Sequence, residues 1–390
     1  MMVLLKSLLR WGARLLLPFI GWWVPVQRLR GVARASGREV ILLAAGQPRW
    51  TDFIIQQLFA AEPRVENCIH VPVWSLQKHL DRAQSAADLT LVGIDRLSAQ
   101  LFLAQDYLAV PPMVSAWLTV PEEVRTYTRA HSRTDSEFRR VKRQGYTSEL
   151  SKSAADYELF YDSYYKPYIR DRHKAKAQVA PRWLLRWVFR RGGIQWVTQN
   201  GEHVAGDLVI KQSRDYIPVV TGLREGRQEL LREGALAALY VHSLEEARHL
   251  GCTRILLGGS KPSLHDGVLR YKAKWLDGLT VHDGHLSANH VQLLRWPRLV
   301  SPVAEFLSQT ALIHHDQDGF SGLWAFPSDL PLTAENLQQQ YHALKLKGLH
   351  RFRILLPGDV PPGFTCPPEV RLIKLAAAEQ VGAGEIKDLG

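Results

Sequence analysis

The chain has 390 residues, of which 46% are hydrophobic and 22% are charged. This composition is typical of folded globular proteins and excludes a wholly disordered chain. The length exceeds that of a usual single core and predicts two or three domains. Cys68, Cys252 and Cys366 are isolated, which excludes a disulfide framework or a cysteine zinc site and fits a reducing compartment.

The net charge of +11 is concentrated in two stretches. Residues 1–40 contain seven positive side chains against Glu39, and residues 125–152 contain eight against Asp135, Glu137 and Glu149. These two stretches account for the whole excess. Two basic regions predict an anionic partner at two places, such as a membrane surface, a phosphorylated cofactor or nucleic acid.

Residues 1–37 are predicted to form an amphipathic segment in the membrane interface. Lys6, Arg10 and Arg14 recur every four residues along one side of a helix, and apolar residues cover most of the rest. Pro18 breaks this helix before about 20 apolar residues accumulate, the length that a membrane span requires. We therefore expect a cytoplasmic protein associated peripherally with the inner face of a membrane. A helix packed on the protein body and an uncleaved signal anchor are the alternatives.

Residues 38–125 alternate short apolar runs with a helical pattern and are predicted to form a first α/β domain. Strands are expected at 40–45, 69–73 and 89–93, and a helix at 51–61. A polar, basic joint then leads to a helix that begins after Ser153 and carries a row of tyrosines, which Pro167 is expected to bend or end. Tyr164 and Tyr168 in this row are candidates for a substrate cleft, and a stripe of core residues is the alternative.

Residues 126–280 are predicted to form a second domain. Asn200-Gly201 lies between two strand-like runs and indicates a hairpin. A third strand at 216–222, a long helix at 229–250 and a buried strand at 253–259 predict a parallel strand pair with a right-handed crossover. Residues 281–390 are expected to form a C-terminal accessory α/β region, with strands at 322–326 and 353–356 around a helix at 333–347.

This order of elements resembles the GNAT superfamily of acyltransferases. The segments Leu257-Gly-Gly-Ser260 and Asp266–Trp275, with the basic run Phe138–Tyr146, are similar to Fem-type and exopolysaccharide-associated members. The resemblance implies an α/β fold of tandem GNAT-like mixed sheets flanked by helices. It also implies acyl transfer to an amine or hydroxyl of a cell-envelope or exopolysaccharide precursor, with a lipid-linked or nucleotide-linked sugar as the acceptor.

The implied donor is an acyl-coenzyme A, first of all acetyl-coenzyme A. In ordinary GNAT enzymes a glycine motif at the start of the long helix holds the donor pyrophosphate. Here Arg224, Gly226 and Arg227 stand in that region with a different spacing, so aminoacyl-tRNA and acyl carrier protein remain alternative donors. Gly258, Gly259 and Ser260, at the end of the buried strand, are further candidates for donor binding. No metal is expected.

Acyl transfer needs a group that accepts the proton of the acceptor and donors for the carbonyl oxygen. The catalytic candidates are Lys272, Asp207, Glu233 and Asp266. Tyr271, Arg170 and His173 join Tyr164 and Tyr168 as candidates for substrate binding. For each carboxylate the competing interpretation is a solvated side chain. The short run His314-His315-Asp316 is interpreted as a polar loop, because no further ligand with suitable spacing accompanies it.

Three functions therefore compete. The first is an acyltransferase at a membrane surface. The second is a catalytically inert GNAT-fold scaffold of a polysaccharide assembly, which the altered glycine motif favours. The third is RNA binding through the basic region 125–152, including the case in which tRNA is the donor.

Overall fold

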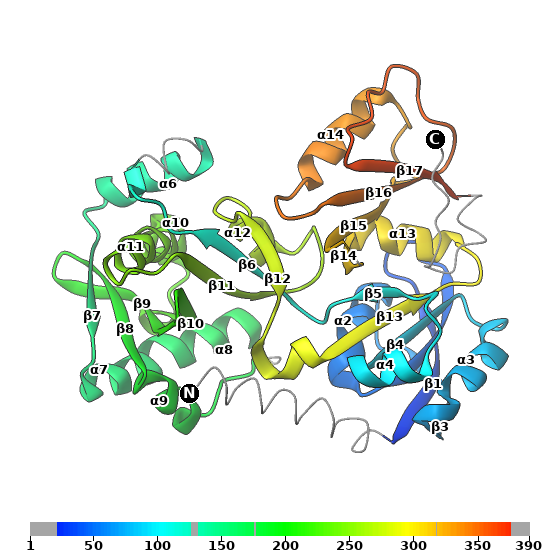
Figure 1. Cartoon of the computed structure of the whole chain (residues 1–390), viewed down its shortest axis with the longest axis horizontal. Coiled ribbons are helices and arrows are strands. Elements are labelled where there is room, and N and C mark those ends of the chain that lie inside the picture. Colours follow the sequence, from blue (N-terminus) through cyan, green and yellow to red (C-terminus); the bar gives the residue numbers. More distant parts are fainter. Residues whose placement is uncertain (1–21, 126–131, 175–176, 317, 376–390) are drawn as a thin grey trace. The chain divides into compact units, whose positions relative to one another are not determined.

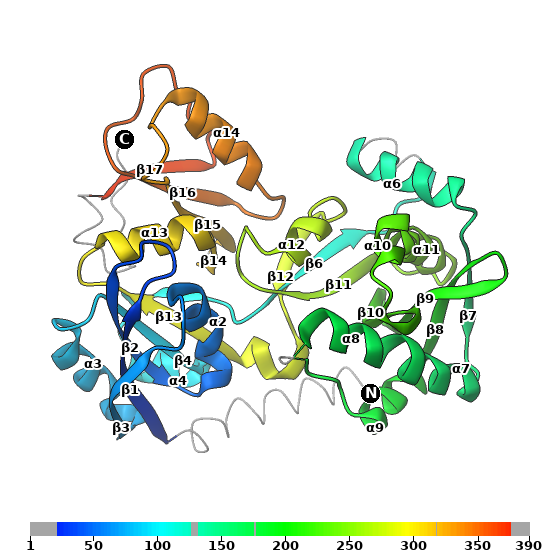
Figure 2. The same ribbon diagram turned by 180° about the vertical axis from the view of Figure 1, so that it is seen from behind.

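A computed structural model describes residues 22–125, 132–174, 177–316 and 318–375. The fold is mixed α/β, with three sheets flanked by helices, as the sequence predicts. The chain forms two compact units (Figures 1 and 2). Unit 1 is built from Met1–Val114, Gly259–Arg270 and Leu279–Gly390, and unit 2 from Ser115–Gly258 and Tyr271–Gly278. The expected ranges 38–125, 126–280 and 281–390 are single stretches of sequence, whereas each unit is assembled from several stretches.

The first sheet of unit 1 has six strands, one of which, β13, comes from a distant part of the chain. In spatial order they are β3 (Arg64–Pro72), β1 (Trp23–Val32), β2 (Glu39–Gly46), β4 (Leu89–Asp95), β13 (His290–Arg295) and β5 (Leu108–Val110). The flanking helices are α2 (Pro48–Leu58), α3 (Leu76–Gln84), α4 (Arg96–Phe102) and α13 (Ser301–Thr310). Alternation along β2 builds a core on each face: Leu42 and Ala44 join the cluster with α2 and α13, while Leu43 joins the cluster with α3.

The second sheet of unit 1 is smaller and lies in the C-terminal part of the chain. Its strands, in spatial order, are β14 (Leu312–His315), β15 (Phe320–Ala325), β16 (Arg351–Leu356) and β17 (Val370–Lys374). The helix α14 (Ala334–Leu344) connects β15 to β16, and this strand pair is parallel. Thr333 caps the helix by accepting a hydrogen bond from the backbone N–H of Asn336.

A third sheet has seven strands, and most of its residues belong to unit 2. Its strands, in spatial order, are β12 (Gly278–Val281), β6 (Val114–Thr119), β11 (Arg254–Ser260), β10 (Asp215–Leu223), β9 (Glu202–Gln212), β8 (Gly192–Gln199) and β7 (Thr147–Ser151). The helices of unit 2 are α6 (Ser132–Arg143), α7 (Ala154–Leu159), α8 (Lys166–His173), α9 (Arg182–Phe189), α10 (Glu229–Glu233) and α11 (Ala235–His249). The short helix α12 (Gly267–Lys272) follows β11.

The two faces of this sheet have different chemistry. Ile194 and Trp196 on β8 belong to an aromatic core formed with the tyrosine-bearing helices and α9. Gln195, between them, points to the opposite face, where Ser243 of α11 donates a hydrogen bond to it at 3.0 Å. The aromatic face is therefore structural, and the α11 face carries the buried polar groups.

Three expectations about local structure were wrong. Residues 23–32 of the expected interface segment form β1, while residues 1–21 lie outside the described part of the chain. Pro167 was expected to bend or end its helix, and the expected end is wrong, because Pro167 occupies the first turn of α8 after a π-helical turn, Phe160–Tyr165, that continues α7. The long helix expected at 229–250 is two helices, since Gly234 adopts a left-handed conformation (φ 102°) between α10 and α11.

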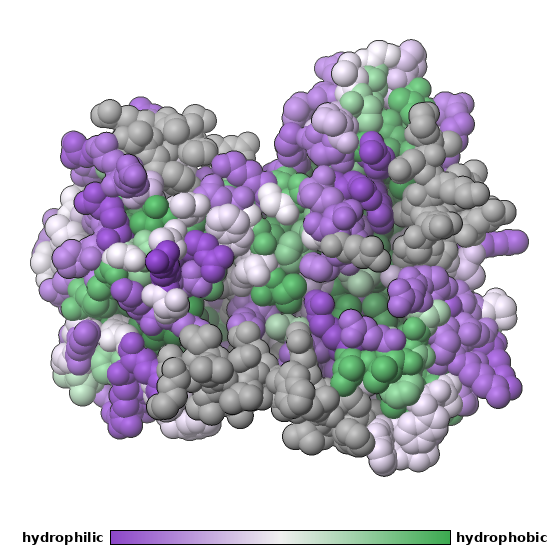
Figure 3. Space-filling model, viewed as in Figure 1, coloured by the Kyte–Doolittle hydropathy of each residue, from purple (hydrophilic) through white to green (hydrophobic). Residues whose placement is uncertain are grey.

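Among the described residues, none of the helices combines the length and the apolar character needed to cross a bilayer. The face drawn in Figure 3 alternates hydrophilic and hydrophobic patches, as the surfaces of folded domains do.

Candidate functional site

The parallel strands β10 and β11 of unit 2 separate soon after they meet. Only Asp215 and Tyr216 of β10 pair with β11, opposite Arg254 and Ile255, although β10 continues to Leu223. Over the same length β10 stays paired with β9 on its other side, apart from a bulge between Pro218 and Val220. A bulge bends a strand and increases its twist. The part of β10 beyond Tyr216, from Ile217 to Leu223, therefore has backbone groups that β11 does not pair.

Unit 1 offers a direct contrast. Its parallel pair, β2 and β4, is in register along five residues, from Leu42 opposite Leu89 to Gly46 opposite Gly93. The strands are so close at the end that a Cβ on Gly46 would lie 2.0 Å from the Gly93 carbonyl oxygen. No opening exists in this pair, so the open strand pair of unit 2 is the candidate site.

A row of polar side chains crosses the sheet toward this opening. Gln195 on β8, Asp207 on β9 and Thr221 on β10 are cross-strand neighbours in register. The Thr221 hydroxyl donates a hydrogen bond to Asp207 Oδ1 at 2.5 Å. Thr221 lies in the part of β10 that is not paired with β11, so the row of polar side chains ends at the opening.

Asp207 is the buried carboxylate of this row, with 4% of its surface exposed. Burial raises the pKa of its carboxyl from 3.8 to about 7, and the hydrogen bond from Thr221 limits that rise. A carboxylate that titrates near neutral pH is suited to accept and release a proton under physiological conditions. Asp207 is therefore the best candidate for a general base among the sequence-predicted residues.

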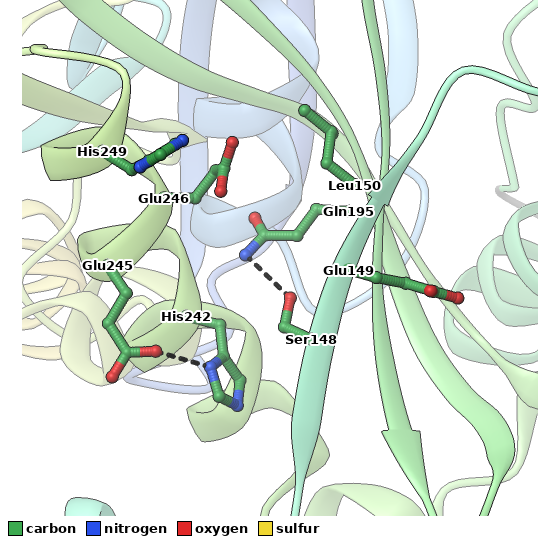
Figure 4. A pocket seen from close by; sticks show the side chains of 8 residues that line it. All are labelled: Ser148, Glu149, Leu150, Gln195, His242, Glu245, Glu246 and His249. Atoms are coloured by element: carbon green, nitrogen blue, oxygen red, sulfur yellow. Dashed lines mark hydrogen bonds and ion pairs between the residues drawn. The ribbon is translucent and has the colours of Figure 1, made fainter.

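Gln195 anchors the other end of the row. Its Oε1 accepts hydrogen bonds from the Tyr216 hydroxyl at 2.6 Å and from Ser243 at 3.0 Å. These bonds fix the amide so that its nitrogen faces Ser148 on β7, at 3.4 Å. A hollow of about 220 Å³ lies there, and charged side chains of α11 form much of its wall (Figure 4). None of the sequence-predicted site residues lines this hollow.

Three tyrosines from different elements converge near Asp207. Burial raises the pKa of Tyr240 on α11 well above its ordinary value, and its electrostatic neighbours are Tyr271, Asp207, Tyr168 and Arg172. Burial likewise raises the pKa of Tyr271 to about 12. The rings of Tyr240 and Tyr271 meet edge to face, with centroids 5.6 Å apart. The structure thus brings together three sequence-predicted residues, Asp207, Tyr168 and Tyr271.

The N-terminus of α11 lies beside a pair of cations. A Cβ placed on Gly234 would lie 3.0 Å from Arg140 Nε, so the arginine packs directly against this turn. Arg140 also forms an ion pair with Glu137, and Lys274 Nζ lies 2.7 Å from the same carboxylate. Glu137 is buried, whereas about a third of each cation's side chain is exposed. Two cations share one carboxylate next to the positive end of a helix, which favours an anion there.

Lys272 and Gly258 are in contact with each other. Lys272 is buried, and its Nζ donates a hydrogen bond to the Gly258 carbonyl at 2.9 Å. This bond connects the last residue of α12 to β11. Gly258 has a φ of 67°, a conformation that favours glycine. Gly259 and Ser260 belong to unit 1, where a Cβ on Gly259 would collide with Met113 and His282.

Two of the predicted carboxylates have other positions. Asp266 belongs to unit 1 and accepts a hydrogen bond from the Leu269 backbone N–H at 2.8 Å, so it acts as the cap of α12. Glu233 ends α10 and is exposed. Among the described residues, no hydrogen bond or ion pair connects Asp266 or Glu233 to Asp207.

The predicted phosphate-binding loop is engaged in packing. Arg224 pairs with Glu202 at 2.6 Å and donates to the His203 carbonyl at 2.7 Å. Gly226 is buried, and a Cβ there would lie 3.1 Å from Pro167. Arg227 is exposed. Since the unbroken helix begins only at Ala235, this loop does not form its N-terminus.

The remaining substrate-binding candidates lie on the tyrosine-bearing helices. Tyr164 is buried and donates its hydroxyl hydrogen to the His203 carbonyl at 2.8 Å, and Tyr168 accepts a hydrogen bond from Arg172. Arg170 is exposed on α8. His173 is the last residue of α8, and its side chain lies outside the described part of the structure.

Comparisons with known proteins find likenesses only among solved structures. No family model and no curated protein matches the chain. FemX is 12% identical, with a TM-score of 0.39 over 73% of this chain and 90% of FemX. L-PGS from Bacillus licheniformis is 13% identical, with a TM-score of 0.31 over 69% and 83% of the two chains. A tandem GNAT protein from the clavulanic acid biosynthesis pathway is 13% identical, with a TM-score of 0.29 over 67% and 81%. Identities this low assign no activity.

Proposed function

We propose that unit 2 is an acyltransferase that moves an acyl group from a coenzyme A thioester to an amine or hydroxyl. The observation that carries the proposal is the opening between β10 and β11, with the buried Asp207 and its hydrogen-bond partner Thr221 at its edge. An extended donor can pair with the backbone groups that β11 leaves free, as an added strand would. Holding a thioester beside an acceptor and a base is the main requirement of acyl transfer.

The phosphates of the donor are assigned to the N-terminus of α11. Arg140 and Lys274 supply positive charge. Gly234 has no side chain that could cover the backbone N–H groups in the first turn of α11. This phosphate site takes the place of the one expected in the loop 224–227, where Arg224 already forms an ion pair with Glu202. The donor alternatives, aminoacyl-tRNA and acyl carrier protein, also carry phosphate groups.

The chemistry follows from the Thr221–Asp207 hydrogen bond. The acceptor nitrogen or oxygen attacks the thioester carbonyl carbon, the carbon–sulfur bond breaks, and the thiolate of coenzyme A leaves. The proton lost by the acceptor passes to the Thr221 oxygen as Thr221 passes its own proton to the Asp207 carboxylate. Asp207 then returns the proton to the thiolate or to solvent. This route requires Asp207 to be ionised, so transfer accelerates as the pH rises through about 7.

Calorimetric titration with acetyl-coenzyme A, at a salt concentration that suppresses loose anion binding, tests donor binding. Arg140→Gln should weaken saturable binding at least tenfold, because it removes one cation and leaves Lys274 to pair with Glu137. Arg139→Gln is the matched control, since Arg139 lies on the same helix, is 73% exposed and pairs with Asp135. Equal affinity in both variants refutes the assigned phosphate site. Absence of saturable binding by the wild type refutes acetyl-coenzyme A as the donor and directs the test to aminoacyl-tRNA.

We further propose that the acceptor is a cell-envelope precursor reached at an anionic membrane surface. Trp22, Trp23 and Trp74 of unit 1 are 45%, 63% and 56% exposed. Exposed tryptophans are typical of proteins that contact the headgroup region. Trp22 and Trp23 belong to the basic stretch 1–40. Trp74 lies beside them, since the centroids of the Trp22 and Trp74 rings are 5.8 Å apart.

Sedimentation of the full chain with vesicles tests this placement. Binding to vesicles containing phosphatidylglycerol should exceed binding to phosphatidylcholine vesicles, and Trp23→Ser with Trp74→Ser should reduce it several-fold. Trp183→Ser is the control, because Trp183 is 72% exposed on α9 of unit 2. An undiminished partition of the double variant contradicts a role for these tryptophans.

A further inference from the structure

The C-terminal sheet of unit 1 carries a cluster of potential metal ligands far from the candidate acyl-transfer residues in sequence. Asp316 and Asp318 lie in the turn between β14 and β15, and His350 directly precedes β16. One ligand atom from each side chain lies within 4.8 Å of the others. This spacing is close to that of three ligands around a single ion, since two bonds of about 2.0–2.2 Å to oxygen or nitrogen span at most about 4.4 Å.

The hydrogen bonding of His350 determines which nitrogen faces the cluster. Its Nδ1 lies 2.9 Å from the Phe320 carbonyl oxygen. A carbonyl oxygen only accepts hydrogen bonds, so Nδ1 carries the proton and the neutral ring presents a lone pair at Nε2. Nε2 lies 3.4 Å from Asp316 Oδ1 and 3.9 Å from Asp318 Oδ2. Nε2 also lies 3.4 Å from the Ser321 hydroxyl oxygen. Two carboxylates that converge on an imidazole nitrogen favour a positive charge there, which either a metal ion or a proton on Nε2 supplies.

This arrangement of His350 is the one that metal-binding histidines usually have, with the second ring N–H donated to a backbone carbonyl. Asp316 is held in place as well. Its Oδ2 accepts a hydrogen bond from the Ser321 hydroxyl at 2.8 Å, and its Oδ1 accepts backbone N–H groups of Asp318 and Gly319. Two arginines of β16 lie near the cluster: Arg351 is 3.7 Å from Asp318 Oδ2, and Arg353 is an electrostatic neighbour of His314.

A second observation comes from His314 on β14. Its side chain is only 1% exposed, and its Nε2 has no hydrogen-bond partner among the described residues. His314 is the direct cross-strand neighbour of Ser321, so the two side chains lie on the same face of the sheet. Asp316 and His350 are among its electrostatic neighbours. A buried imidazole nitrogen without a partner is uncommon in folded proteins, and here it lies beside the convergent ligands.

We propose that Asp316, Asp318 and His350 bind one divalent transition-metal ion, with His314 beside it. One imidazole and two carboxylates suit Zn²⁺ or Mn²⁺ better than Mg²⁺, which prefers oxygen ligands alone. The ion joins the β14–β15 turn to the start of β16 and so stabilises the C-terminal sheet. This site is independent of the acyl-transfer chemistry proposed for unit 2.

The full chain, freed of metal with a chelator, is titrated with Zn²⁺ and with Mn²⁺ by calorimetry, and its thermal unfolding is followed with and without each ion. We expect one saturable site per chain and a higher melting temperature with metal, because the ion binds the folded state. Asp318→Asn and His350→Gln should each weaken binding at least tenfold. Asp318 is 66% exposed, so its replacement leaves the fold intact even if the histidine variant unfolds.

Matched controls separate this site from loose binding. Asp359→Asn and His342→Gln change an exposed aspartate and an exposed histidine elsewhere in the C-terminal part of the chain and should bind metal as the wild type does. Absence of saturable binding would overturn the proposal and leave His350 as a protonated partner of the two carboxylates. Binding that Asp318→Asn does not weaken would overturn it equally.

Discussion

Replacement of Asp207 by asparagine should change how the stability of the protein depends on pH. The carboxyl has an ordinary pKa of 3.8 in the unfolded chain and a pKa of about 7 when buried beside Thr221. The folded protein therefore binds the extra proton between these two values, and stability falls as the pH rises through that window. Asparagine has nearly the same shape and does not titrate.

The size of the effect follows from the two pKa values. At about 1.4 kcal/mol for each pH unit, ionisation of Asp207 removes about 4 kcal/mol of stability between pH 4 and pH 8. The free energy of unfolding of Asp207→Asn should therefore gain up to about 4 kcal/mol relative to the wild type over this range. All other titrating groups are common to both proteins and cancel in the difference.

Urea unfolding at half-unit pH intervals, followed by circular dichroism, measures this difference. Ser243→Ala serves as the control, because it alters the same buried polar row without removing a titrating group, and its curve should run parallel to the wild type. Thr221→Val should give a larger total loss that extends to higher pH, since it removes the hydrogen bond that lowers the pKa of the carboxyl. Parallel curves for Asp207→Asn and the wild type would refute the buried, neutral-titrating carboxyl.

Two further predictions concern the elements that shape the opening. Gly234→Ala should lower the free energy of unfolding by about 2–3 kcal/mol, because the residue has a φ of 102° and its new Cβ would collide with Arg140. Gly251→Ala is the control: this glycine has a φ of 66° but open space around it, so the loss should be only about 1 kcal/mol. Equal losses in urea unfolding would contradict the packing of Arg140. Lys272→Met should lower the free energy of unfolding by about 2 kcal/mol, because it removes the hydrogen bond to the Gly258 carbonyl. Lys142→Met, at an exposed site, should leave the free energy of unfolding almost unchanged. An unchanged stability of Lys272→Met would show that the hydrogen bond is not formed.

The sequence predicts the elements of unit 2 well because their signals are local. Asn200 and Gly201 have φ values of 53° and 80°, as the predicted tight hairpin requires. The parallel pair of β10 and β11 follows from the strand–helix–strand order. Its early separation does not, because the length of strand pairing depends on the bulge after Pro218 and on packing against other elements.

The charges of the candidate site were harder to predict because their partners are distant in sequence. Arg140 belongs to the basic stretch 125–152, for which the sequence predicts only a positively charged surface. Its position against Gly234 depends on Glu137 and Lys274, which are 137 residues apart in the sequence. Thr221 and Tyr240 carry no local signal that separates them from ordinary strand and helix residues. His350 was missed as a partner of Asp316 for the same reason.

Hydrogen–deuterium exchange in the presence and absence of acetyl-coenzyme A tests most directly whether the opening of unit 2 binds the donor. If the donor pairs with the free edges of the strands, amides of β10 from Val219 to Leu223 and of β11 from Leu256 to Gly258 should gain protection, together with the first turn of α11. Protection that appears only in the basic stretch around α6, or nowhere, would contradict the proposal that this opening is an acyl-donor site.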